Sequence, residues 1–333
     1  MESLRKVKKV ELHRHMEGAV RLQTVLDVAD EAGVRLPTRK LEELRHHALI
    51  LEPMADLATV LNKFELVQSC LATPGILKRV AYENCIDAFN DGIRVLELRY
   101  SPGFIAMNHP QLHFDSIHRA IVDGVEKAEK ELKGKLAVGL ICIISREQPA
   151  LEHEKTVDFV LRNRDGFVGF DLAGDEAAFP PGPFKKYFDR IRTTSLGITV
   201  HSGEVPGSAT SVRECIELLG AQRIGHGVQI IHNPAVMDFV IEKNVTLENC
   251  PTSNFLTHGV DKLENHPLPL FLKKGVPVTL NSDDPHIFGI DLTHEYEVSQ
   301  KFLKLTQKDF DRLNQQSLKV SFIDKKKVQT AWA

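Results

Sequence analysis

The chain has 333 residues, of which 42% are hydrophobic and 26% are charged. This is an ordinary globular mixture, and it excludes a disordered, collagen-like or coiled-coil chain. Its 42 Lys and Arg residues nearly balance its 45 Asp and Glu residues, so no overall positive field favours a nucleic acid as the main partner. The length fits one large domain, two ordinary ones or a barrel with an insertion.

The sequence shows no membrane-spanning or secretory segment. The first residues, Met1 to Lys9, are charged and lack the apolar core of a signal peptide. The longest nearly unbroken apolar run, Leu136 to Ile144, is much shorter than the roughly 20 residues that cross a bilayer. The five cysteines form no C-x-x-C pair, so we expect neither a disulfide framework nor a thiolate zinc knuckle. A cytoplasmic protein without a membrane partner is the simplest expectation.

Eight short β-branched runs, each ending in small, polar or charged residues, alternate with mostly amphipathic helical stretches. Such alternation predicts parallel strands joined by crossovers, and eight units predict closure into a (β/α)₈ TIM barrel, an α/β fold. We expect residues 1–333 to form a single hydrolase-type barrel domain. The predicted strands are Lys9–His13, Arg94–Arg99, Leu136–Ser145, Val168–Leu172, Ile198–His201, Arg223–His226, Val245–Glu248 and Val276–Asn281.

The first crossover, about residues 18–91, is too long for one helix, so we predict a helical insertion after the first strand. Such an insertion could cover the C-terminal mouth of the barrel as a lid, or pack against its side. After Phe302 the tail is predicted to end in a helix whose Lys325-Lys326-Lys327 run faces solvent. Other predicted helices are Val20–Ala32, Met54–Leu71, Ile76–Asn90, Ile117–Leu132, Thr210–Leu219 and Ala235–Lys243.

The sharpest local motif is His13-Arg14-His15 at the end of the first predicted strand. Residues two apart on a strand point the same way, so both imidazoles are expected to enter one cavity. Two neutral imidazoles at this spacing suit a divalent metal, zinc especially.

Further candidate ligands end other predicted strands. His201 and His226 close two of them, and Asp283 and Asp284 follow the last one. In a barrel the carboxyl ends of all strands face one pocket, so these distant residues are expected to converge.

Six segments, in the same order, resemble the adenosine deaminase family of the amidohydrolase superfamily, a family of metal-dependent hydrolases. They spread across nearly the whole chain. The resemblance implies a (β/α)₈ barrel, one zinc ion per chain and a 6-aminopurine substrate. The segments are His13-Arg14-His15-Met16-Glu17-Gly18, Asp171-Leu172-Ala173-Gly174-Asp175-Glu176, His201-Ser202-Gly203-Glu204, Arg223-Ile224-Gly225-His226-Gly227, Asn249-Cys250-Pro251-Thr252-Ser253-Asn254 and Asn281-Ser282-Asp283-Asp284-Pro285.

By motif position, the resemblance assigns the residues to three groups. The implied zinc ligands are His13, His15, His201 and Asp283. The implied catalytic residues are Glu204, His226 and Asp284. The implied substrate contacts are His15, Glu17, Gly174 and Asp284, with Gly174 acting through its backbone.

Elementary chemistry fits these roles. Zinc lowers the pKa of a bound water to about 7, and attack at C6 of an aminopurine places negative charge on N1. Glu204 can supply the proton for N1 if it stays protonated, and His226 can orient or deprotonate the water. Asp284 can form a hydrogen bond at N7, although it could also cap a helix ahead of Pro285. Glu204 could instead be an ordinary first-turn acid.

Two positions depart from the family pattern. Glu17 stands where the family usually has Asp beside the sugar, and Ser202 replaces a usual Ala. We therefore predict hydrolytic deamination of adenosine or deoxyadenosine to the inosine product and ammonia, and leave other adenine compounds open: a modified adenosine, a cyclic or 5′-nucleotide, or free adenine. A different metal-barrel hydrolase and a non-catalytic nucleoside-binding relative are the rival hypotheses.

The remaining histidines receive no functional role from the sequence. His266 and His286 are expected to lie on the surface or in loops, and Asn249 to Asn254 is expected to be a structural turn near the pocket with Cys250 buried in it. No Lys ends the fourth predicted strand to bridge a second metal, so one metal is expected. The oligomeric state stays open.

Overall fold

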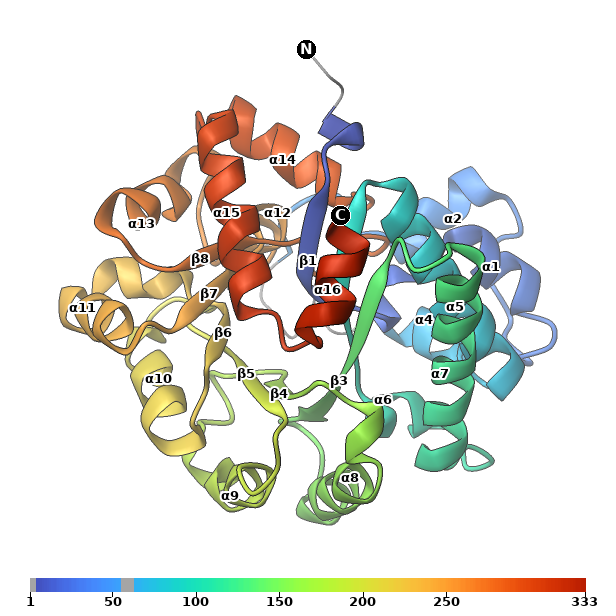
Figure 1. The fold of residues 1–333 in the computed structure, drawn as a ribbon. Coiled ribbons are helices and arrows are strands. Elements are labelled where there is room, and N and C mark those ends of the chain that lie inside the picture. The colour runs from blue at the N-terminus through green and yellow to red at the C-terminus, as the bar shows by residue number, and fades with distance from the viewer. Residues whose placement is uncertain (1–3, 55–62) are drawn as a thin grey trace.

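The computed structural model describes residues 4–54 and 63–333, and within them eight parallel strands follow one another around a barrel (Figure 1). This confirms the predicted (β/α)₈ TIM barrel. Each predicted strand is present with ends shifted by at most a few residues. The strands are β1 (Lys9–His15), β2 (Ile93–Tyr100), β3 (Ala137–Ser145), β4 (Gly169–Ala173), β5 (Gly197–Ser202), β6 (Arg223–His226), β7 (Thr246–Asn249) and β8 (Val278–Leu280).

The barrel closes at the residues that matter most for the site. Asp283, just beyond β8, forms a parallel bridge with Arg14 of β1. The Asp283 N–H donates to the His13 carbonyl at 2.9 Å, and the His15 N–H donates to the Asp283 carbonyl at 2.9 Å. The backbone seam therefore places Asp283 between the two histidines of β1.

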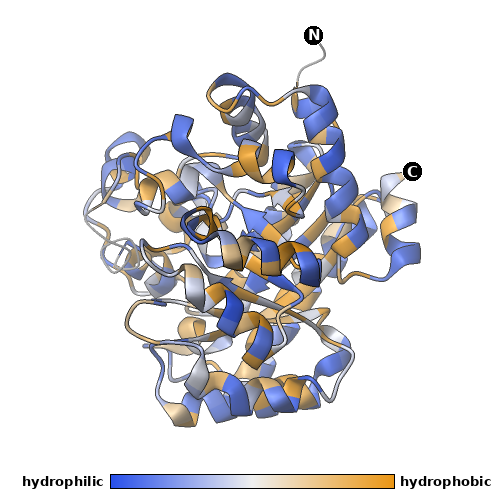
Figure 2. Cartoon of the chain, turned by 90° about the vertical axis from the view of Figure 1, so that its left-hand side faces the viewer, coloured by the Kyte–Doolittle hydropathy of each residue, from blue (hydrophilic) through white to orange (hydrophobic). Residues whose placement is uncertain are grey.

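Helices surround the strands, with their hydrophobic positions turned inward and the strands themselves mainly hydrophobic (Figure 2). Most helices begin with a recognisable start signal, such as Thr73 before Pro74 or Asn233 before Pro234, whose side chains accept the N–H of the third following residue. The helices after β2 are α6 (Pro102–Ala106), α7 (Phe114–Glu131), α8 (Ala150–Arg162), α9 (Lys185–Ile191), α10 (Ala209–Glu214), α11 (Pro234–Lys243), α12 (Pro251–Leu256), α13 (Leu268–Lys274), α14 (Leu292–Lys301), α15 (Gln307–Val320) and α16 (Lys325–Trp332).

Between β1 and β2 the described residues contain α1 (Leu22–Val28), α2 (Leu41–Ala48), α4 (Glu65–Cys70) and α5 (Pro74–Asn90). The predicted helix Met54–Leu71 is observed only as α4, because residues 55–62 lie outside the described part. Phe64, at the start of α4, lines the cavity at the carboxyl end of the barrel. The segment therefore contributes to the cavity wall; whether it moves as a lid stays a prediction.

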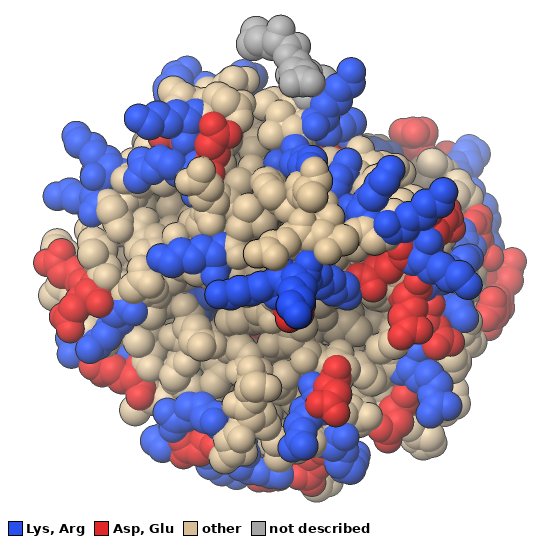
Figure 3. Space-filling view, in the orientation of Figure 1, with Lys and Arg blue, Asp and Glu red and all other residues tan. Residues whose placement is uncertain are grey.

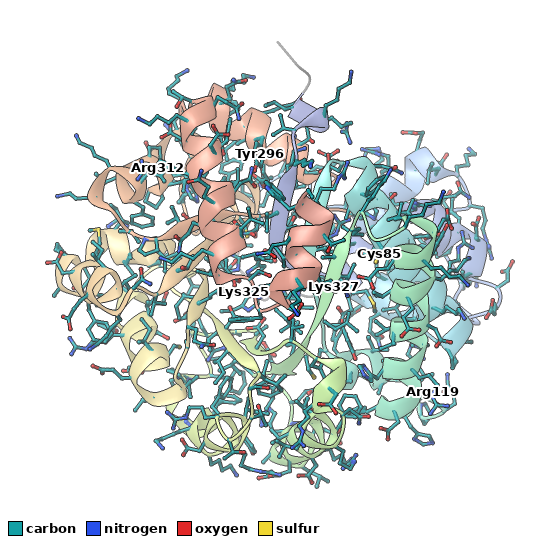
Figure 4. The ribbon with its side chains drawn as sticks, in the orientation of Figure 1. Cys85, Arg119, Tyr296, Arg312, Lys325 and Lys327 are labelled. Carbon is teal, nitrogen blue, oxygen red and sulfur yellow. The ribbon has the colours of Figure 1, made fainter. Side chains whose placement is uncertain are left out.

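The tail closes the opposite, amino-terminal end of the barrel. α15 and α16 cross this end in Figure 1, and Ile323, Val328 and Ala331 pack into a buried cluster with Val10 and Val95 of the strands. Lys325 and Lys327 of α16 are exposed on this face, as predicted (Figures 3 and 4). None of the described helices is both long enough and apolar enough to span a membrane.

Candidate active site

Four predicted metal ligands lie together at the carboxyl end of the barrel. His13 and His15 come from β1, His201 from β5, and Asp283 from the loop after β8. One ligand atom of each residue lies within 4.8 Å of those of the other three. His15 Nε2 is 3.0 Å from His201 Nε2, and Asp283 Oδ1 is 3.2 Å from His13 Nε2 and 3.3 Å from His15 Nε2.

This donor set fits one divalent cation. His13 Nε2 is buried and has no hydrogen-bond partner among the described residues. Burial lowers the pKa of His15 and brings that of His201 to about 3, so both rings offer lone pairs. Burial and Arg99 oppose a proton on His13, yet Asp283 raises the pKa of His13 to about 9. The site thus favours positive charge between His13 and Asp283, which a divalent cation held by these residues would supply.

A second possible ligand group is less suitable. His226, Cys250 and Asp283 also bring ligand atoms within 4.8 Å of one another. Burial, together with the Asp283 carboxylate, holds the pKa of the Cys250 thiol well above its usual value. Because metals bind the thiolate and not the thiol, Cys250 is better explained as the buried small residue that the sequence predicts.

Three buried charged residues orient the imidazoles, and the sequence did not assign them this role. Glu248 Oε2 lies 2.7 Å from His13 Nδ1, and Asp171 Oδ1 lies 3.1 Å from His201 Nδ1. Arg99 donates to both carboxylates, at 2.7 Å to Asp171 and 2.8 Å to Glu248. Such partners turn the Nε2 atoms of the ligands toward the metal position. Their only sequence signal is a charged residue on a barrel strand.

Glu204 lies in the loop after β5 and is buried. Burial, with the Asp283 and Glu176 carboxylates, raises its pKa to about 8. Its Oε2 is 3.5 Å from His226 Nε2. A carboxyl group that keeps its proton at neutral pH can act as an acid toward a bound molecule.

Glu176 holds the turn that presents Glu204. Its carboxylate accepts the N–H groups of Gly203 at 2.9 Å, Glu204 at 2.7 Å and Val205 at 3.0 Å. The Ser202 hydroxyl, one of the two departures from the family pattern, donates to the same carboxylate at 3.1 Å. The sequence analysis names Glu176 only as part of a motif and does not predict this function as an anchor.

His226 ends β6 with a left-handed backbone (φ 64°). Its Nδ1 lies 3.0 Å from Asn254 Nδ2, and Asn254 Oδ1 lies 3.1 Å from His266 Nε2. His266 lies in a loop, as predicted, but it is 3% exposed, so the alternative that it lies on the surface is wrong. Its burial could not be predicted because its partner, Asn254, belongs to a different segment.

Asp284 lies beside Gly18 at the same end of the barrel. Asp284 Oδ1 is buried and has no hydrogen-bond partner in the described part of the chain. Burial, together with the adjacent Asp283, holds the pKa of Asp284 well above its usual value. A Cβ added at Gly18 would lie 1.7 Å from Asp284 Oδ1, so only glycine permits this approach.

Glu17 and Gly174 border the cavity on another side. Glu17 Oε1 accepts the Ser101 N–H at 2.8 Å, whereas the buried Glu17 Oε2 has no partner within the described residues. Burial raises the pKa of Glu17 to about 7. Gly174 has φ +108°, and a Cβ there would lie 2.3 Å from the Glu147 carboxylate, so the turn requires glycine.

The predicted residues surround a single cavity of about 380 Å³. Its wall is largely apolar, with Phe104, Ile143 and Phe288 among the lining side chains. Such a volume and lining suit a small aromatic molecule held by a few polar groups. The predicted residues that line it are His15, Glu17, Gly174, His201, Glu204, His226, Asp283 and Asp284, and His13 lies behind them.

The family model for adenosine deaminase matches residues 8–331. The chain belongs to the adenosine deaminase family. This confirms the family and the class of enzyme, an aminohydrolase, that the motifs predict. The adenosine deaminase of Serratia proteamaculans is 39% identical over 320 residues, which cover 96% of this chain and 95% of that protein.

Solved structures share the fold. The adenine deaminase of Arthrobacter aurescens superposes with a TM-score of 0.89 and 25% identity, covering 98% of this chain and 97% of its own. An amidohydrolase of Burkholderia ambifaria with bound zinc gives a TM-score of 0.86 at 24% identity, over 99% of this chain and 89% of its own. These likenesses support the barrel independently of the closer sequence relatives.

Proposed function

We propose that this aminohydrolase uses one zinc ion, held by His13, His15, His201 and Asp283, to deaminate adenosine to inosine and ammonia. The observation that carries the proposal is the placement of Glu204, a carboxyl group with a raised pKa, in the same cavity as this donor set. A divalent cation bound there would act as a Lewis acid and lower the pKa of a water molecule.

The residues around the cavity provide the rest of the chemistry. Glu204 donates a proton to purine N1 as water attacks C6, so that negative charge does not accumulate on the ring. His226, 3.5 Å from Glu204, contacts the attacking water. Asp284, whose Oδ1 has no partner among the described residues, donates a hydrogen bond to N7, which can only accept. Glu204, once its proton is on N1, accepts the proton that the attacking water gives up and passes it to the C6 amino group. That group leaves as ammonia, and the C6 hydroxyl returns a proton to Glu204 as the C6 carbonyl of inosine forms.

The same reaction on another adenine compound is the second candidate. Glu17, with its unpartnered Oε2, is the observation that favours it, because a longer side chain than the family's Asp changes the end of the cavity where a sugar would lie. Relatives named adenosine deaminase and adenine deaminase both match this chain. Among the described residues, the cavity lining includes five carboxyl groups, from Glu17, Glu147, Glu204, Asp283 and Asp284, and no Lys or Arg. This charge favours a substrate without a phosphate.

An ammonia-release screen tests the substrate. The zinc-loaded protein is incubated with adenosine, deoxyadenosine, adenine and adenosine 5′-monophosphate, and Glu17→Asp is measured beside the wild type. We expect adenosine and deoxyadenosine to react fastest and Glu17→Asp to change the ratio of adenosine to adenine turnover. A highest rate with adenine would replace adenosine as the substrate, and no ammonia from any compound would refute the function.

The described structure also bears on the expected location. All five cysteines are free and buried. Free thiols are typical of a reducing compartment, so a cytoplasmic location stays our proposal.

A further inference from the structure

A chain of buried hydrogen bonds leads away from the cavity behind His226, through Asn254 to His266. The bond farthest from the cavity determines which atom donates in each of the others. The Leu268 backbone N–H donates to His266 Nδ1 at 3.2 Å. A backbone N–H can only donate, so His266 Nδ1 accepts and a neutral ring carries its proton on Nε2. Burial lowers the pKa of His266 to about 3, which keeps that ring neutral.

The proton on His266 fixes the orientation of the next side chain. His266 Nε2 is 3.1 Å from Asn254 Oδ1, and the carbonyl oxygen of an amide accepts. The Asn254 amide therefore turns its Nδ2 toward His226. This settles the assignment of oxygen and nitrogen that the shape of an amide alone leaves open.

Asn254 in turn determines which nitrogen of His226 carries the proton. Asn254 Nδ2 lies 3.0 Å from His226 Nδ1. Because an amide nitrogen only donates, a proton on Nδ1 would set two donors against each other. His226 Nδ1 must accept, and the proton lies on Nε2, which is 3.5 Å from Glu204 Oε2 and 3.9 Å from Asp283 Oδ2.

We infer that Asn254 and His266 are positioning residues that hold His226 with its proton on Nε2, so that His226 meets the reaction as a hydrogen-bond donor and not as a base. The inference rests on the proposed function for the reaction itself. His226 then donates to the oxygen that attacks C6 and stabilises the charge on it. With its proton on Nε2, neutral His226 has no lone pair facing the cavity and cannot take the proton that the attacking water gives up. Glu204, once it has given its own proton to N1, takes that proton.

The test uses the zinc-loaded protein labelled with ¹⁵N-histidine. The nitrogen shifts of His226 in the wild type are expected to show a protonated Nε2 and an unprotonated Nδ1. His266→Met removes the donor at similar volume, so the Asn254 amide can turn over and both tautomers of His226 are expected to appear. We expect kcat to fall about tenfold or more with little change in KM, the usual effect of losing such an outer partner.

Two variants separate positioning from a general structural effect. His266→Gln keeps an N–H donor for Asn254 Oδ1 and is expected to restore kcat to within a few-fold of the wild type. His232→Met changes an exposed histidine outside the chain of hydrogen bonds and is expected to alter neither the His226 shifts nor kcat. Zinc content should stay at one per chain throughout.

A wild-type His226 protonated on Nδ1 would overturn the inference, and so would a His266→Met protein with unchanged His226 shifts and unchanged kcat. If His266→Met fails to fold, the wild-type spectrum still decides between the two tautomers. If the shifts are as expected but no variant, including the wild type, releases ammonia from adenosine, the tautomer assignment stands and the proposed function falls.

Discussion

The two ends of the barrel contain similar buried charged residues but use them in opposite ways. Toward the amino-terminal end, Arg223 donates to Glu97 at 2.5 Å and to Glu248 Oε1 at 2.6 Å. Glu248 reaches the other end as well, because its Oε2 contacts His13. Glu97 also accepts the Ser321 hydroxyl and the Phe322 N–H of the tail, at 2.8 Å and 2.6 Å. At the carboxyl-terminal end, three buried atoms have no hydrogen-bond partner in the described structure: His13 Nε2, Glu17 Oε2 and Asp284 Oδ1.

This difference is consistent with a binding site at the carboxyl-terminal end, where the unpartnered atoms of Glu17 and Asp284 belong to residues that line the cavity. A buried charged or polar group without a partner costs free energy, so such groups persist where a ligand completes them. The tail completes one end of the barrel, because its backbone and side chains supply the missing hydrogen bonds. At the other end, a cation and a substrate would supply the missing partners under the proposed function.

Substituting Glu204 with Gln should give the largest effect at the open end. The amide has nearly the same shape but has no acidic proton to give N1, so we expect kcat to fall by about 10²–10⁴. Steady-state assays with adenosine measure kcat, and metal analysis of the purified variant measures its zinc content. Zinc should remain bound, and the exposed Glu214→Gln serves as the control; near-normal turnover in Glu204→Gln would refute its role as the acid.

At the closed end, Glu97→Gln should affect stability and leave the reaction alone. Arg223 would lose one of its two carboxylate partners in the barrel interior, and the amide would keep only part of the hydrogen bonding. We expect the free energy of unfolding to fall by about 3 kcal/mol, the lower end of the cost of breaking a buried ion pair. Urea unfolding measures the change.

The control for Glu97→Gln is Glu242→Gln on the surface, for which we expect the free energy of unfolding to change by less than about 0.5 kcal/mol. A fall in kcat of the folded Glu97→Gln protein comparable to that of Glu204→Gln would mean that the two ends are not separate in function.

Gly18→Ala tests how closely Asp284 must approach the strand end. The new Cβ would meet Asp284 Oδ1 at 1.7 Å, so the carboxyl group must move from its place at the cavity wall. We expect KM for adenosine to rise about tenfold through the weakened N7 contact, while zinc stays bound. Gly182→Ala, where a Cβ would meet nothing within 4 Å, is the matched control. Equal KM values in the two variants would contradict the proposed contact of Asp284.

Turnover is also expected to depend on pH. Because burial and the neighbouring carboxylates raise the pKa of Glu204 to about 8, its acidic form is present below that pH and is lost above it. We expect kcat to decline as pH rises through about 8, by roughly tenfold per unit beyond it. A kcat profile between pH 6 and 10 measures this. A plateau extending to pH 10 would show that protonated Glu204 is not required.

The sequence predicts the strands well, and it also predicts that four candidate metal ligands lie together, for a physical reason. β-branched runs such as Val276–Asn281 have few alternatives to a buried strand, and a barrel brings all strand ends together. His201 and Asp283 could therefore be placed in one cavity without knowing any side-chain distance.

The partners of those ligands could not be predicted in this way. Glu248 and Arg99 lie on buried strands. Which charged side chains contact one another across the barrel depends on its shear and not on their spacing along the chain. His266 reaches the site only through Asn254, across a turn whose path the sequence does not specify. In the sequence Glu176 cannot be distinguished from an ordinary acidic loop residue. Its function depends on the turn at Gly203, whose N–H groups donate to its carboxylate.

The central claim is that His13, His15, His201 and Asp283 hold one zinc ion. Anomalous X-ray diffraction at the zinc edge, on crystals of protein purified without chelator, tests it most directly. We expect a single anomalous peak within about 2.0–2.2 Å of the three Nε2 atoms and an Asp283 oxygen. A peak elsewhere, two peaks, or these four side chains coordinating no ion in zinc-supplemented crystals would contradict it.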